Sequence, residues 1–86
     1  MNKLTKISLD TRDMEHPVPL DKAMKILPEL SDDNYLYMLH RKKPIPLLDL
    51  AQERGLITLS KEDEHEDWHI IICANKNTDL ETLIDA

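Results

Sequence analysis

The sequence predicts an α+β fold, namely a two-layer α/β sandwich with the element order β-α-β-α-β-β and a four-stranded mixed sheet. Residues 6–10 alternate polar and apolar side chains, as a half-buried strand does, and a helix with two prolines at its start follows them. A second strand, a polar loop and a short helix come next. Residues 56–60 and 68–73 are apolar runs separated by an acidic turn, which is typical of an antiparallel hairpin.

The first helix is predicted to open at Pro17 and Pro19, because proline lacks the N–H group that has no partner in a first helical turn. Apolar residues then recur at spacings of three and four, which gives the helix one apolar face. Pro28 is expected to end or kink this helix near Leu27. Residues 35–39 are short, apolar and aromatic, and are predicted to be the second strand.

A second short helix is predicted around residues 47–51, and Gly55 is expected to end it in the left-handed conformation. Thr78 and Glu81 fit a capping box, so a short C-terminal helix is expected there. Strands joined through a helix usually run parallel with a right-handed crossover. We therefore expect the first two strands to be parallel neighbours and both main helices to cover one face of the sheet. The apolar stripe of the C-terminal segment is expected to pack on its own sheet or on another protein. The face opposite the main helices is expected to be open unless the chain dimerises.

Length, charge and composition limit the classes of function. The 86 residues are expected to form one domain over residues 1–86, with a core at about 6–74 and a C-terminal extension at about 75–86. The formal net charge of −6 argues against binding to nucleic acid or to an anionic membrane surface. The first ten residues have no apolar signal-peptide core, and no run approaches the length of a bilayer span. We therefore expect a cytoplasmic protein.

Residues 9–20, with the sequence LDTRDMEHPVPL, are the most informative stretch of the chain. They resemble the start of the TusA/SirA-like sulfur-carrier domains, whose motif is L-D-x-R-G-x-x-C-P-x-P. The matching residues are Leu9, Asp10, Arg12, Pro17 and Pro19. Asp13 stands at the glycine of that motif, and His16 stands at its sulfur-carrying cysteine. The resemblance extends over roughly residues 6–74 and implies a TusA/SirA-like fold.

A second signature is the sequence HRKKPIPL at residues 40–47. Together with the LDTR opening, it resembles an uncharacterised group, domain-of-unknown-function family 2249. Those domains have an L-D-x-R opening and an H-x-x-P-x-P-L-like loop after the second strand. The chain is identified as a member of that group, which is similar in fold to the sulfur carriers but has no defined reaction.

Sulfur transfer is not expected, because the imidazole of His16 cannot hold a persulfide. Cys73 is the one cysteine of the chain, so no intrachain disulfide can form. It follows three isoleucines in a predicted strand, and buried cysteines of that type are usually inert. Two interpretations of His16 stay open. In the first, it donates hydrogen bonds to an anion, acts as an acid or base, or coordinates a metal. In the second, it is an exposed residue at a helix start, satisfied by water or a nearby carboxylate.

A candidate ligand-binding site is predicted from five residues: Asp10, Arg12, His16, His40 and Arg41. Parallel neighbouring strands would bring their carboxyl ends to one edge, and ligands of open α/β sheets tend to bind there. A guanidinium suits a carboxylate or phosphate, and free N–H groups at the first helix start suit an anion. The alternative is a structural ion pair of Asp10 with Arg12 or Arg41 that only fixes the loops.

No metal ion or other cofactor is expected. His65 and His69 are four residues apart, but they lie in a predicted turn and strand, where helical ligand spacing does not apply. His16 and His40 with Asp10 would make a two-histidine, one-carboxylate set, and unlinked histidines are the simpler alternative. The acidic turn at residues 62–67 is most simply a solvated hairpin tip, or else a contact for a basic partner.

Three hypotheses for the function follow. The first is a small binding or regulatory module, without catalysis of its own, for a small anion or a protein partner. The second is an enzyme component that uses His16 as an acid–base group, with Arg12 and Arg41 orienting an anionic substrate. The third is a pure protein-interaction module that acts through the open sheet face, on which a homodimer is also expected to form.

Overall fold

A computed structural model describes residues 4–84 of the chain. Its strands are β1 (Thr5–Asp10), β2 (Asn34–His40), β3 (Ile57–Glu62) and β4 (Trp68–Cys73). Its α-helices are α1 (Val18–Ile26), α2 (Ile45–Glu53) and α3 (Leu80–Ile84). A single 3-10 turn, η1 (Leu27–Glu29), continues α1 where Pro28 was expected to end or kink it.

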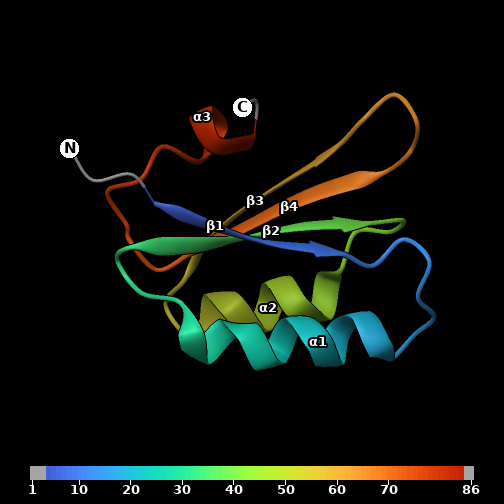
Figure 1. Ribbon diagram of the computed structural model, residues 1–86, viewed down its shortest axis with the longest axis horizontal. Coiled ribbons are helices and arrows are strands. Elements are labelled where there is room, and N and C mark those ends of the chain that lie inside the picture. The colour runs from blue at the N-terminus through green and yellow to red at the C-terminus, as the bar shows by residue number, and fades with distance from the viewer. Residues whose placement is uncertain (1–3, 85–86) are drawn as a thin grey trace.

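The sheet confirms the predicted fold class. Its strand order is β1-β2-β4-β3, with β1 parallel to β2, and β4 antiparallel to both β2 and β3. Helices α1 and α2 lie side by side on one face, and α3 lies on the other (Figure 1). Because β1, β2 and β3 run in the same direction, their carboxyl ends meet at one edge of the sheet. Helices α1 and α2 begin from that edge.

The ends of α1 and α2 follow from local residue chemistry. Each helix has a proline at its N-cap and another in its first turn, Pro17 with Pro19 and Pro44 with Pro46. Because Pro44 and Pro46 belong to the helix start, α2 begins at Ile45, earlier than residue 47, where the leucine pattern predicted it. Gly55 has φ of 77°, as expected for the left-handed residue that follows a helix end.

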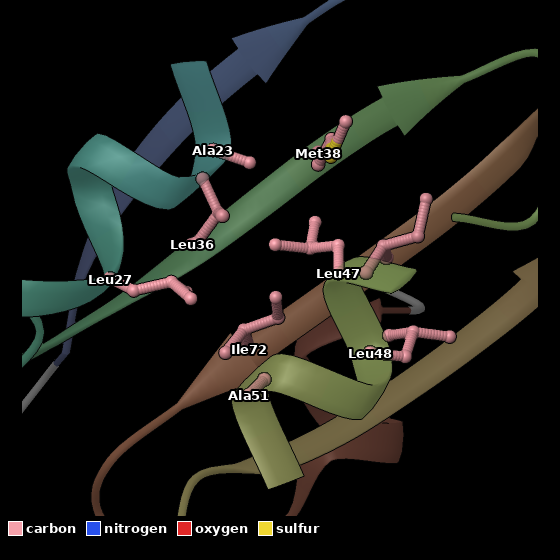
Figure 2. Packing of buried hydrophobic residues seen from close by; sticks show 9 residues of the cluster. Ala23, Leu27, Leu36, Met38, Leu47, Leu48, Ala51 and Ile72 are labelled. Atoms are coloured by element: carbon pink, nitrogen blue, oxygen red, sulfur yellow. The ribbon is translucent and has the colours of Figure 1, made fainter. Parts of the chain in front are cut away.

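The main core lies between the sheet and helices α1 and α2 (Figure 2). From β2 and β4 it takes Leu36, Met38, Ile70 and Ile72, all fully buried. The helices contribute Ala23, Leu27, Leu47, Leu48 and Ala51. The chain has no phenylalanine, so leucine, isoleucine and methionine fill this space. The buried alanines, one on each helix, take little room and suit close packing of the helices on the sheet.

The opposite face of the sheet is covered at one end by α3. The C-terminal stripe therefore packs on its own sheet, one of its two expected positions, and the expectation of an open face is corrected at that end. There Tyr35, Ile71, Cys73 and Ile84 form a second buried cluster. The start of α3 also differs from the predicted capping box at Thr78. The carboxylate of Asp79 caps the helix instead, accepting hydrogen bonds from the Glu81 N–H at 3.1 Å and the Thr82 hydroxyl at 3.0 Å.

A matched pair of substitutions tests the core. Met38 is fully buried under the helices, whereas Met24 on α1 is 37% exposed. We expect Met38→Ala to lower the free energy of unfolding by about 2–5 kcal/mol, because it leaves a cavity. Met24→Ala should lower it by about 0.5 kcal/mol or less. Urea unfolding of both variants measures the difference, and equal losses would contradict this packing.

Candidate functional site

A cavity of about 250 Å³ lies where α1 and α2 begin, next to the carboxyl end of β2. Its polar lining consists of His16, His40, Lys42 and Lys43. Its apolar lining includes Leu20, Met38 and Leu47 together with three prolines of the helix starts. The cavity thus joins basic and apolar side chains, as small-ligand sites commonly do, and it is slightly smaller than the usual range for such sites.

The two helix starts that line this cavity have the same local sequence. Residues 17–20 read Pro-Val-Pro-Leu and residues 44–47 read Pro-Ile-Pro-Leu. Each segment follows a polar loop at the carboxyl end of a parallel strand, and each places a leucine in the cavity wall. This repeated Pro-x-Pro-Leu pattern is the signal in the sequence that could have predicted one shared site, with Lys42 and Lys43 beside His40.

His40 is held by a buried hydroxyl. Thr11 is fully buried, and its Oγ1 donates to the Leu39 carbonyl at 2.8 Å while lying 3.0 Å from His40 Nδ1. A hydroxyl has one proton to donate, so His40 Nδ1 must carry the proton of the second bond. A neutral His40 ring therefore keeps Nε2 as its hydrogen-bond acceptor.

The charge state of His40 follows from its surroundings. Burial lowers the pKa of His40 below 6.5, a backbone hydrogen bond with Thr11 opposes this shift, and the nearby Lys42 ammonium adds to it. The ring is therefore neutral at pH 7, and the lysines supply the positive charge of the cavity. Lys43 Nζ also lies 5.8 Å from the centre of the Trp68 ring, a cation–π contact.

The five predicted site residues do not lie together in the structure: two line the cavity, two form an ion pair, and one is an exposed loop residue. His16 and His40 line the cavity, whereas Asp10 and Arg12 bind each other away from it. Arg12 Nε and Nη2 donate to the two Asp10 carboxylate oxygens at 3.0 and 2.8 Å. Arg12 Nη1 donates to Asp67 Oδ2 at 3.2 Å. Arg41 is exposed and does not line the cavity.

Strand alternation explains this division. Asp10 pairs with Leu39 in the parallel register, so both point to the same face of the sheet. His40 is the next residue and points to the opposite face, toward α1 and α2. The structural ion pair that the sequence left open as an alternative for Asp10 and Arg12 is therefore the arrangement observed.

The start of α1 offers fewer N–H groups than expected. Residues 17 and 19 are prolines, which have no N–H, and the Val18 N–H already donates to the Glu15 carbonyl at 3.0 Å. An anion in the cavity would therefore depend chiefly on histidine and lysine side chains.

The other histidines have separate surroundings. Within residues 4–84, no three His, Cys, Asp or Glu side chains gather as a metal-binding group, so His16, His40 and Asp10 form no such set. His65 lies exposed in the hairpin turn. His69 Nε2 is 2.8 Å from Asp63 Oδ2 and His69 Nδ1 is 2.7 Å from the Tyr37 hydroxyl.

The comparison with known families agrees with the two signatures. The sequence model of the family described as "Uncharacterized conserved protein (DUF2249)" matches residues 8–73. The chain belongs to the DUF2249 family. The match runs from β1 to the end of β4, and it includes both loops that line the cavity. Searches among curated proteins and among solved structures give no significant match. No helix within residues 4–84 has the length and apolar character needed to cross a membrane.

The Arg12 ion pairs of this DUF2249 domain give a pH-dependent stability. Hydrogen bonds from Arg12 lower the pKa of Asp10 from 3.8 to about 2. A carboxyl group with a lowered pKa stabilises the folded state above about pH 4, and this contribution is lost as the pH falls toward 2. We expect Arg12→Gln to be less stable than the wild-type domain at pH 7 and nearly equal to it at pH 2.

Urea unfolding at a series of pH values measures this difference. Arg41→Gln removes the same charge from an exposed position and serves as the control. A difference between Arg12→Gln and the wild type that does not change with pH would contradict the role of Asp10.

Cys73 of the DUF2249 domain is predicted to be chemically silent. Its side chain is fully buried, with Sγ 3.6 Å from the Asn75 carbonyl and from Thr78 Oγ1. We expect Ellman's reagent to react slowly with the folded protein and rapidly in urea. A persulfide donor should add little sulfur, as seen by mass spectrometry, with Cys73→Ser as the blank. Stoichiometric and transferable sulfur on native Cys73 would overturn this prediction.

Proposed function

We propose that this DUF2249 domain is a cytoplasmic binding or regulatory module that takes a small organic anion into the cavity between α1 and α2. The observation that carries the proposal is the meeting of two histidines and two lysines at one cavity of about 250 Å³. A positive site on a chain of net charge −6 is a local feature that the overall charge does not explain.

The lining also limits the class of ligand. Lys42 and Lys43 would bind a carboxylate or phosphate through charge-assisted hydrogen bonds. Leu20, Pro44 and Pro46, which line the cavity and are not fully buried, would contact an apolar part of the same molecule. His40 is neutral at pH 7, and its Nε2 would accept a hydrogen bond. A small organic anion that also carries a hydroxyl or amino group could bind the lysines, the apolar lining and His40 Nε2 together.

A second candidate is an enzyme component with a histidine acid–base group, and one observation favours it. The Thr11 hydroxyl fixes the tautomer of His40, as orienting groups do for catalytic histidines. His40 rather than His16 would then be the acid–base group. Arg12 could not orient the substrate, because Asp10 and Asp67 already bind it.

The protein-interaction hypothesis receives less support from the geometry. The apolar end of the second sheet face packs under α3. The strand β1 presents Lys6, Ser8 and Asp10 to the remainder of that face, so a partner or a second copy would meet a largely polar surface.

The binding proposal predicts the behaviour of a matched pair of variants. In an amide-shift titration with phosphate and small hydroxy acids, residues 16–20 and 40–47 should shift together. Lys42→Gln should weaken binding about tenfold, the effect of one charge-assisted hydrogen bond. Lys25→Gln removes the same charge from an exposed position in the last turn of α1 and should leave affinity unchanged.

The affinity of the cavity for an anion should change with pH in one direction. An anion favours protonated His40, whose pKa lies below 6.5, so affinity should rise only as the pH falls below that value. His40→Gln should reduce this rise, because it removes one of the two histidines that line the cavity. The absence of any shift in residues 16–20 and 40–47 with millimolar anions at pH 6 would refute the proposal.

A further inference from the structure

A second group of titratable side chains lies on the sheet face opposite the cavity. The Tyr37 hydroxyl is 2.7 Å from His69 Nδ1, and His69 Nε2 is 2.8 Å from Asp63 Oδ2. Tyr37 on β2 and His69 on β4 are diagonal neighbours, because Tyr37 pairs with Ile71 and Leu39 pairs with His69. Their rings meet edge to face, with the planes at 89°.

The direction of each hydrogen bond in this group can be assigned. Asp63 Oδ1 accepts from the N–H groups of His65 and Asp67 at 2.8 and 3.0 Å, which fixes the carboxylate. The hydrogen bond from His69 lowers the pKa of Asp63 to about 2, so the carboxylate is ionised at neutral pH. His69 Nε2 must then carry a proton. In a neutral ring, Nδ1 is the acceptor and Tyr37 donates to it.

This arrangement is that of a nucleophile, a base and an orienting carboxylate. We propose that Asp63, His69 and Tyr37 form a second site, in which the Tyr37 oxygen is a nucleophile toward small acyl donors. Tyr37 would be the catalytic residue, and His69 and Asp63 would position and activate it. This site is separate from the proposed anion cavity, because it lies on the other face of β2.

The surroundings of Tyr37 suit that role. The Lys6 Nζ lies 4.5 Å from the centre of the Tyr37 ring, a cation–π contact that holds a cation beside the phenol. A hollow of about 130 Å³, lined by Lys6, Ser8 and Leu39 among others, adjoins Tyr37. Only a small acyl group would fit. The His69 and Asp63 side chains are 27% and 30% exposed, so both are partly open to solvent.

The reaction is balanced without any further reagent. The Tyr37 oxygen attacks the acyl carbon while its proton passes to His69 Nδ1. The bond from the acyl carbon to its leaving group then breaks, and the leaving group takes that proton from His69. The products are O-acyl-Tyr37 and the protonated leaving group, and His69 returns to its neutral form.

Asp63→Asn is designed to change the tautomer of His69 while it keeps the hydrogen bonds of the turn. The asparagine Oδ1 can still accept the two turn N–H bonds, whereas its NH₂ group would face His69 Nε2. The amide would therefore force the ring proton onto Nδ1, the wrong tautomer for accepting the Tyr37 proton. Ring nitrogen NMR of His69 reports this change directly. Glu62→Gln removes one neighbouring charge outside the relay and is the matched control.

The test is acetylation by N-acetylimidazole, followed by peptide mass spectrometry, with N-acetyltyrosine amide as the reference phenol. Tyr37 in the wild-type domain should react faster than the reference. The rate should fall on the order of 10²-fold in Asp63→Asn and in His69→Gln, a usual contribution of a general base. Glu62→Gln should react like the wild type.

Any of three results would overturn the proposal. Tyr37 could be acetylated no faster than the reference phenol, its rate could be unchanged in Asp63→Asn, or its rate could fall equally in Glu62→Gln. If Asp63→Asn disturbs the amide spectrum of the hairpin, His69→Gln decides the question in the same way. An unchanged rate in that variant would leave the three side chains a purely structural link.

Discussion

The parallel pairing of β1 with β2 determines where the residues of the cavity and the Asp10–Arg12 ion pair lie. It brings the carboxyl ends of the two strands together, so the loops that follow them, and the helices α1 and α2 that those loops begin, share one edge of the sheet. Its register also decides which side chains share a face. Asp10 lies with Leu39, and His40 lies on the opposite face with Met38. A shift of one residue would exchange these faces and dismantle both the core and the cavity.

The proline-rich helix starts are the second requirement of the cavity. In each Pro-x-Pro-Leu segment the prolines set the backbone for a first helical turn and remove N–H groups that would otherwise need partners. The cavity wall is consequently more apolar than an ordinary pair of helix starts would make it. Its polarity comes from side chains, among them two lysines and His40, which is neutral at neutral pH. This combination supports recognition of a small amphipathic anion more than of a bare inorganic ion.

Local patterns in the sequence were enough to predict the architecture, because alternation, proline placement and Gly55 each act over a few residues. The alternation of side chains along the strands also shows that two of the predicted site residues, Asp10 and His40, lie on opposite faces of the sheet. Ile7 and Leu9 face the core, so Asp10 must face away, and applying this alternation to Leu36, Met38 and His40 would have placed Asp10 and His40 on different faces. The contacts of Thr11 with His40 and of Tyr37 with His69 join residues 29 and 32 positions apart in the chain. They depend on the register between strands, which no local pattern specifies. The cover that α3 gives to Cys73 depends in the same way on tertiary packing.

The acidic turn between β3 and β4 shows how one surface feature links the two faces. Its sequence is that of a solvated tip, yet its carboxylates make specific contacts. Asp67 binds Arg12, which follows β1, and so ties the hairpin to the rest of the sheet, whereas Asp63 binds His69 within the hairpin itself. Trp68, the first residue after the turn, contacts Lys43 at the cavity. The position of the hairpin therefore affects the Arg12 ion pairs, the Tyr37 relay and one cationic group of the cavity together. A ligand that displaced Lys43 from Trp68 would act on the same short segment that orients His69.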